Sequence, residues 1–167
     1  MSLRFFSNPG NTDLDIYKEL FPQVKELLDK DEHWVTNLAN LSALLKQAFE
    51  KISWVGFYMY NGQRLILGPF QGKMACTFIP IGKGVCGTAA EQKKTVIVPN
   101  VHEFPGHIAC DDESNSEIVV PIMRGDALLG VLDLDSTALN AFNEVDKQYL
   151  EKIAELLVHN FLGNYRL

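Results

Sequence analysis

Apolar residues recur along the chain with two different periods, and the first of these predicts helices at the N-terminal end. From Asp13 to Asp29 apolar side chains recur every three or four residues, which places them on one face of a helix. Pro22 lies inside this stretch and is expected to kink or restart the helix. The same spacing predicts a second helix from about Glu32 to Lys51, with Asp31 as its N-cap.

The middle of the chain changes to a period of two, which is typical of strands with one buried face. Asn61 and Gly62 predict a type I′ hairpin turn between the first two strands. The helical period returns from about Glu144 to Leu162, where Asn143 is the expected N-cap. The expected strands are 52–60, 64–70, 77–79, 95–98, 117–123 and 127–135, with a short helix at 85–92.

Hairpin connections make the sheet antiparallel, and the helices at the two ends of the chain must cover one of its faces. The expected fold class is therefore α+β, with a mainly antiparallel central sheet and terminal helices packed on one face. With 167 residues, 47% of them hydrophobic, the chain can build one well-packed core. We expect an N-terminal extension at 1–12 and a single domain at 13–167.

Charge and composition exclude several classes of partner. The chain has 15 Lys and Arg against 21 Asp and Glu, a net charge of −6, and such an acidic surface repels nucleic acid. No apolar run approaches the roughly 20 residues of a membrane helix, and the N-terminus lacks a signal-peptide pattern. We therefore expect a cytoplasmic protein that binds neither nucleic acid nor a membrane.

Three cysteines, Cys76, Cys86 and Cys110, are too few and odd in number for a secreted domain held together by disulfides. No Cys-x-x-Cys pair is present, so the chain has no thioredoxin-like motif of its own. The residue types leave three roles open: buried core thiols, redox chemistry, or zinc binding by Cys110 together with His102 and His107. The spacing of that last group does not fit a structural zinc site, which has tightly paired ligands.

Acidic residues at strand positions form a second candidate group. Asp133 and Asp135 project from the same face of one strand, about 7 Å apart, and Glu117 begins the neighbouring strand. One interpretation is a solvated edge of the sheet. The other is an acidic pocket, in which burial and mutual repulsion raise at least one pKa. A carboxylic acid that is protonated near neutral pH could bind a substrate or donate a proton.

Two further features indicate the wall of a pocket. The segment 82–87 has the spacing G-x-G-x-x-G without the context of a dinucleotide fold, and its glycines indicate a tight loop beside a pocket. Trp54 and Tyr58 share one face of a strand with Gly56 between them. They are either core residues or an aromatic ligand box, and Gly56 is expected to leave a gap for a small apolar group.

Seven blocks of the sequence resemble the free methionine-(R)-sulfoxide reductases, which are single GAF domains. The similarity extends from about Leu14 to Phe161, and all three cysteines fall in the matching blocks. The blocks are NLANLSALL (37–45), WVGFY (54–58), LGPFQGK (67–73), GVCGTA (84–89), GHIACD (106–111), SNSEIVVP (114–121) and GVLDLDS (130–136).

The resemblance implies a thiol-dependent enzyme that reduces free L-methionine (R)-S-oxide to methionine and so repairs oxidised methionine. It implies Cys110 as the nucleophile that becomes a sulfenic acid, Cys76 as the resolving cysteine that closes a disulfide, and Cys86 as an auxiliary cysteine. A thioredoxin-type reductant would reopen the disulfide. No bound cofactor and no metal are expected.

The resemblance also implies a substrate site. Glu117, Asp133 and Asp135 would bind the substrate ammonium group and protonate the sulfoxide oxygen. The face of Trp54 would hold the methyl group, with Tyr58 beside it. Two other functions stay open: a GAF-type sensor that binds a small ligand without turnover, and a cysteine-linked chromophore or metal site.

A homodimer is expected, because the terminal helices carry more apolar positions than one sheet face needs. GAF domains commonly pair through such helices. The positions concerned are Leu20, Val24, Leu27, Leu150, Ile153, Leu157 and Phe161.

Overall fold

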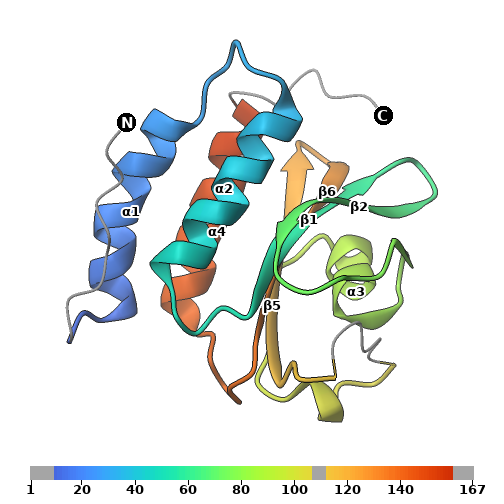
Figure 1. Cartoon of the computed structure of the whole chain (residues 1–167). Helices are drawn as coiled ribbons and strands as arrows, with labels where there is room; N and C mark the ends of the chain where they lie inside the picture. The colour runs from blue at the N-terminus through green and yellow to red at the C-terminus, as the bar shows by residue number, and fades with distance from the viewer. Residues whose placement is uncertain (1–9, 107–111, 160–167) are drawn as a thin grey trace.

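The computed structural model describes residues 10–106 and 112–159, in which helices lie on both faces of a single sheet (Figure 1). The helices are α1 (Asp13–Leu27), α2 (Trp34–Ala48), α3 (Gly84–Gln92) and α4 (Glu144–Leu157), with a short 3-10 helix, η1, at Val101–Glu103. The strands are β1 (Trp54–Tyr60), β2 (Arg64–Gln71), β3 (Phe78–Pro80), β4 (Val96–Val98), β5 (Ser116–Arg124) and β6 (Ala127–Ser136).

The six strands form one antiparallel sheet in the order β3-β2-β1-β6-β5-β4. Helices α2 and α4 lie against one face and α1 packs on both of them, while α3 lies against the other face (Figure 1). The predicted α+β fold, with terminal helices on one face, is confirmed. Within the described ranges, none of the helices has the length and apolar character needed to cross a membrane.

Alternation along the central strands divides the core into two parts. On β1, Val55, Phe57 and Met59 face the helices and share a core with α1, α2 and α4. Trp54 and Tyr58 point the other way, into a smaller cluster that includes residues of α3. The period of two in the sequence therefore corresponds to two faces of the sheet, one covered by α2 and α4 and the other by α3.

The two terminal helices follow the prediction closely. Helix α1 continues through Pro22, so the helix does not restart there, while the kink stays a prediction. Pro22 is exposed, so the carbonyl that loses its hydrogen bond lies on the side that water reaches. Helix α4 begins as predicted with Asn143, which forms a capping box with Asp146. The predicted continuation to Leu162 extends beyond the described residues.

Helix α2 begins later than predicted. Its N-cap is His33, whose Nδ1 accepts a hydrogen bond from the backbone N–H of Val35 at 3.3 Å. Asp31 is not the cap, because its own N–H donates to the carboxylate of Asp29 and forms a separate turn. The chain therefore makes one more turn before the helix starts.

The hairpin between β1 and β2 is confirmed, but its turn is not type I′. Gly62 has a positive φ of 92°, whereas Asn61 is not among the non-glycine residues with positive φ, and type I′ requires positive φ at both central positions. Instead, the Asn61 carboxamide oxygen accepts hydrogen bonds from the N–H groups of Gln63 and Arg64 at 3.1 and 3.0 Å. The side chain closes the turn.

Most of the apolar positions that motivated the homodimer lie in the core of the chain itself, whereas Leu27 is half-buried and Phe161 lies outside the described residues. Leu20, Val24, Leu150, Ile153 and Leu157 are all completely buried between the helices and the sheet. The three-helix layer uses them, because α1 packs on α2 and α4 rather than on the sheet alone. A homodimer stays a prediction, now without this argument.

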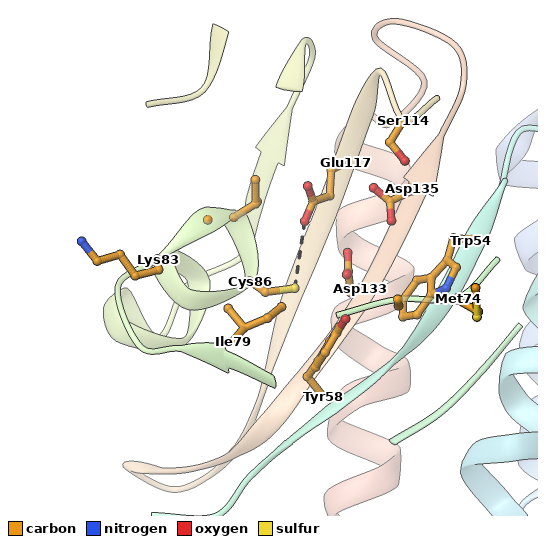
Figure 2. A pocket seen from close by; sticks show the side chains of 13 residues that line it. Trp54, Tyr58, Met74, Ile79, Lys83, Cys86, Ser114, Glu117, Asp133 and Asp135 are labelled. Atoms are coloured by element: carbon orange, nitrogen blue, oxygen red, sulfur yellow. Dashed lines mark hydrogen bonds between the residues drawn. The ribbon is translucent and has the colours of Figure 1, made fainter. Parts of the chain in front are cut away.

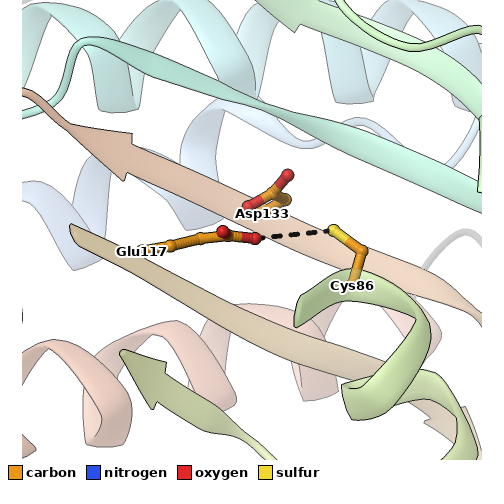
Figure 3. Close-up of side chains that lie close together, drawn as sticks. All are labelled: Cys86, Glu117 and Asp133. Carbon is orange, nitrogen blue, oxygen red and sulfur yellow. Dashed lines mark hydrogen bonds between the residues drawn. The ribbon is translucent and has the colours of Figure 1, made fainter. Parts of the chain in front are cut away.

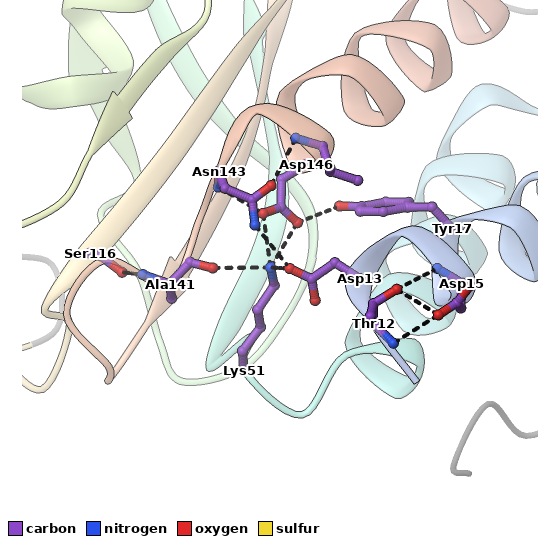
Figure 4. A network of polar contacts seen from close by, with 10 residues as sticks. Thr12, Asp13, Asp15, Tyr17, Lys51, Ser116, Ala141, Asn143 and Asp146 are labelled. Carbon is purple, nitrogen blue, oxygen red and sulfur yellow. Dashed lines mark hydrogen bonds and ion pairs between the residues drawn. The ribbon is translucent and has the colours of Figure 1, made fainter. Parts of the chain in front are cut away.

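One buried ionic cluster joins the ends of the helices (Figure 4). The Lys51 ammonium group lies 2.7 Å from Asp13 Oδ2 and 2.8 Å from Asp146 Oδ1, and it donates to the Ala141 carbonyl at 3.0 Å. The Tyr17 hydroxyl donates to the same Asp146 carboxylate at 3.0 Å. This Lys51 cluster ties the start of α1 to the start of α4.

Candidate functional site

A pocket opens on the α3 side of the sheet (Figure 2). It has an empty volume of about 520 Å³, which includes space open to solvent. Its walls come from β1, β5 and β6, from the start of α3, and from the segment between β2 and β3. The lining residues are Trp54, Tyr58, Met74, Ala75, Ile79, Lys83, Gly84, Val85, Cys86, Ser114, Glu117, Asp133 and Asp135. All five substrate-binding residues expected from the sequence are among them.

Strand register brings the three acidic residues together. Glu117 on β5 lies opposite Asp135 on β6, and Asp133 lies between Gly56 of β1 and Val119 of β5. The three carboxylates point into the same space in front of the sheet (Figure 2). Glu117 and Asp133 are each only 6% exposed, and Asp135 is half-buried. The structure therefore shows an acidic pocket and not a solvated edge.

Burial changes the protonation of two of these acids. It raises the pKa of Glu117 well above its usual range, and the charges of Asp133 and Asp135 add to the rise. Burial also raises the pKa of Asp133 to about 6, although hydrogen bonds from Cys86 and Glu117 oppose the rise. The Oδ1 atom of Asp133 is buried and has no hydrogen-bond partner among the described residues. Glu117 can thus hold a proton near neutral pH, while Asp133 offers an acceptor to a ligand.

Cys86 lies in the first turn of α3 and is a free, buried thiol (Figure 3). Its Sγ lies 4.0 Å from Oε1 of Glu117. Burial raises the pKa of Cys86 well above its usual range, and the charges of Asp133 and Glu117 raise it further. The thiol is therefore protonated and a weak nucleophile in this environment.

Cys86, Glu117 and Asp133 are also the residues whose side chains could bind a metal ion. Within the described ranges, Cys86, Glu117 and Asp133 offer ligand-type atoms that all lie within 4.8 Å of one another. A metal needs its ligands deprotonated, whereas the pKa of each of these groups is raised. The cluster is better suited to an ammonium group and to proton donation.

The aromatic wall of the pocket differs from the prediction in one respect. A Cβ atom placed on Gly56 would lie 2.5 Å from Cη2 of Trp54, so the indole itself fills the space that was expected to be a gap. The ring stacks on Phe70 at 5.4 Å between centroids and lies 6.1 Å from Tyr58. An apolar group can therefore pack on the pocket side of Trp54, but not between the two aromatic rings.

The segment 73–76 runs past this wall and carries Cys76, which is half-buried and disulfide-bonded. Cys110 and His107 lie outside the described residues, so the positions of the expected nucleophile and of one proposed zinc ligand are not described. The third member of the zinc group, His102, has its Nε2 2.9 Å from Oδ1 of Asn115. This contact occupies one of the two His102 ring nitrogens.

Sequence reasoning missed several residues of the site. Met74 is 90% exposed at the mouth of the pocket, and Ser114 is buried in its wall. Both lie in irregular segments, where neither hydrophobic period applies. The tight loop predicted at 82–87 is present, since Lys83 and Gly84 line the pocket and Gly82 and Gly84 have positive φ.

Comparison with known proteins identifies the family. Residues 31–160 match the GAF domain family. The chain is 49% identical over 151 residues to the free methionine-R-sulfoxide reductase of Saccharomyces cerevisiae, covering 86% of this chain and 84% of that protein. The chain belongs to the free methionine-R-sulfoxide reductase family of GAF domains.

Two further members of this family support the assignment. The free methionine-R-sulfoxide reductase of Escherichia coli is 43% identical over 143 residues, covering 86% of this chain and 87% of that protein. The structure of the free methionine-R-sulfoxide reductase of Neisseria meningitidis in complex with its substrate superposes with a TM-score of 0.88 at 43% identity. That match covers 96% of this chain and 95% of the other.

Proposed function

We propose that this chain reduces free methionine-(R)-sulfoxide to methionine. One observation carries the proposal: two buried carboxylic acids with raised pKa values, Glu117 and Asp133, lie beside the aromatic face of Trp54 and near the segment that bears Cys76. The substrate has an α-ammonium group, a sulfoxide oxygen and an S-methyl group, which suit these features. The named relatives support this substrate and are the basis for the R isomer.

The acids would divide the work according to their protonation. Asp133 and Asp135 bind the ammonium group, whose positive charge offsets the repulsion between the carboxylates. Glu117 is the proton donor to the sulfoxide oxygen, because burial and two neighbouring carboxylates raise its pKa. The methyl group packs on Trp54, with Tyr58 beside it.

The cysteines would carry the two electrons. The Cys110 thiolate attacks the sulfoxide sulfur and forms an S–S bond while the oxygen is protonated. The oxygen then passes to the Cys110 sulfur as its bond to the substrate sulfur and the S–S bond break, so methionine leaves and Cys110 becomes a sulfenic acid. The Cys76 thiol then attacks the sulfenic sulfur, forming a Cys76–Cys110 disulfide and releasing water. A cytoplasmic dithiol protein of the thioredoxin type reduces it by exchange. The disulfide-bonded state of Cys76 supports this assignment, with the free thiol Cys86 as an auxiliary group.

The substrate assignment is tested by changing the charge of the substrate. N-acetylation removes the ammonium group and leaves buried carboxylates without their cation, so kcat/KM should fall by about a thousandfold. The methyl ester of methionine sulfoxide keeps the ammonium group and serves as the matched control, with a much smaller loss. Equal kcat/KM for the free and N-acetylated substrates would contradict the proposal.

The cysteine roles are tested by single-turnover measurements. Cys110→Ser should release no methionine with any reductant. Cys76→Ser should release about one methionine per enzyme and then stop when thioredoxin is the reductant. Full cycling of Cys76→Ser, or turnover by Cys110→Ser, would contradict the respective assignment.

A further inference from the structure

We propose that Tyr58 and Trp54 are positioning residues for Cys76, because their polar tips hold the backbone of the segment 73–76 against β1. The inference rests on the proposed function, in which Cys76 is the resolving cysteine. It gives the aromatic wall a second role, in the closure of the disulfide, beside contact with the substrate.

Two hydrogen bonds connect the wall to the segment. The indole N–H of Trp54 donates to the carbonyl of Lys73 at 3.0 Å, and the hydroxyl of Tyr58 donates to the carbonyl of Cys76 at 3.0 Å. Both donors belong to rings that are at least 96% buried and stand on a central strand of the sheet. The segment 73–76 is thus attached at both of its ends to a central strand of the sheet.

The Trp54 ring is held in place from two sides. A Cβ atom on Gly56 would lie 2.5 Å from its Cη2 atom, and one on Gly72 would lie 2.5 Å from its Cδ1 atom. The ring is therefore seated against the backbone of β1 and against the residue that precedes Lys73. Such a ring has little freedom to turn, so its N–H group stays aimed at the Lys73 carbonyl.

The Tyr58 hydroxyl remains protonated and can therefore donate its hydrogen bond. Burial raises its pKa, and the neighbouring acidic groups raise it further, so the hydroxyl keeps its proton at neutral pH. The carbonyl it holds belongs to Cys76 itself. Disulfide formation requires the two Cα atoms to approach within about 7 Å, so a fixed Cys76 backbone keeps its sulfur within reach of a sulfenic acid.

Tyr58→Phe is the decisive variant, since it removes the hydroxyl and keeps the ring. Tyr60→Phe is the matched control, because Tyr60 lies on the same strand and its hydroxyl donates to the Gly62 carbonyl at 2.8 Å, away from the segment. Reduced protein is mixed with free methionine-(R)-sulfoxide, and methionine release and disulfide closure are followed in the same sample. The ratio of the two rate constants cancels any change in substrate binding. Loss of one hydrogen bond should lower the ratio of closure to release about fivefold in Tyr58→Phe, but not in Tyr60→Phe.

A second measurement does not depend on activity. Trypsin cuts after Lys73, which is 57% exposed in its side chain, and cleavage after Lys83 serves as the internal reference. Tyr58→Phe should speed cleavage after Lys73 relative to Lys83, because the segment opens more often. Tyr60→Phe should not.

The two measurements separate the possible failures. Equal closure-to-release ratios and equal cleavage in Tyr58→Phe and Tyr60→Phe would overturn the positioning role. Full cycling of Cys76→Ser would instead overturn the proposed function, and with it the role assigned to Cys76. Faster cleavage with an unchanged ratio would show that the anchor holds the segment without serving disulfide closure, which also overturns the inference.

Discussion

The sheet separates two buried clusters of charged groups that are built in opposite ways. On the helix side, the ammonium group of Lys51 lies between the carboxylates of Asp13 and Asp146, with the carbonyl of Ala141 and the hydroxyl of Tyr17 completing the contacts (Figure 4). This arrangement supplies the compensating charge from within the chain. The completely buried carboxylate of Asp146 thus has a cation of the chain as its direct partner.

On the pocket side, acidic groups lie close together, and their burial favours the protonated forms. The pKa values of Glu117, Asp133 and Cys86 are all raised (Figure 3), and in the part of the chain that the structure describes Asp133 Oδ1 has no hydrogen-bond partner. Such an arrangement destabilises the ionised form of the folded chain. The helix-side cluster therefore stabilises the fold, whereas the pocket-side cluster leaves polar groups that a substrate can bind.

The largest effect is expected from Glu117→Gln, which should separate activity from stability. The amide cannot donate the acidic proton, so kcat/KM for free methionine-(R)-sulfoxide should fall about a thousandfold. The melting temperature should stay equal or rise, because a buried acid that opposes its neighbours is replaced by a neutral group of the same shape. Steady-state kinetics and thermal unfolding test both parts. A large loss of stability with normal activity would reverse the assignment of the two clusters.

Lys51→Met should give the opposite result. Removing the ammonium group leaves Asp146 completely buried without its cation, so the free energy of unfolding should fall by about 3 kcal/mol, with KM for the substrate unchanged. Lys147→Met is the control, because Lys147 pairs with exposed Glu144 at 3.5 Å and should cost less than about 0.5 kcal/mol. Denaturant unfolding measures both. Equal losses in the two variants would mean that the Lys51 cluster contributes no more than a surface pair.

The sequence predicted the pocket-side cluster better than the helix-side one. Asp133 and Asp135 are two residues apart on a strand, so their common face follows directly from the period of two, and Glu117 follows from the adjacent strand. Lys51 and Asp146 are far apart in the sequence, and no spacing rule connects the end of one helix with the start of another. Lys51 follows α2 and Asp146 begins α4, and the packing of these two helices on the same face of the sheet brings them together.

Details decided by single side chains could not be predicted either. The indole of Trp54 lies over Gly56, where it fills the space that an absent side chain would leave. Asn61 closes its turn through its side chain, which competes with the backbone geometry that the dipeptide usually adopts. The hydrogen bonds from Trp54 and Tyr58 to the segment 73–76 have no sequence signal, since their acceptors are backbone carbonyls that every residue carries.

The smallest expected effect is a pH dependence that belongs to the pocket side alone. The pKa of Asp133 is raised from 3.8 to about 6 in the folded chain, so between these values the folded state binds more protons than the unfolded state. Stability therefore falls as pH rises from about 4 to about 7, and about 1 kcal/mol of the fall from this one group should lie between roughly pH 5 and pH 7. The asparagine side chain in the Asp133→Asn variant does not titrate, so the variant lacks this contribution to the pH dependence of stability.

The measurement is the difference in the free energy of unfolding between the wild type and Asp133→Asn, taken at several pH values, so that the other carboxylates largely cancel. The difference should shift in favour of Asp133→Asn as pH rises. When Lys51→Met is added to both proteins, the difference between them should keep the same pH dependence, because Lys51 lies with α1 and α4 on the helix side of the sheet. Parallel pH profiles for the wild type and Asp133→Asn would show that burial of Asp133 carries no protonation cost, and the contrast between the two clusters would then rest on Glu117 alone.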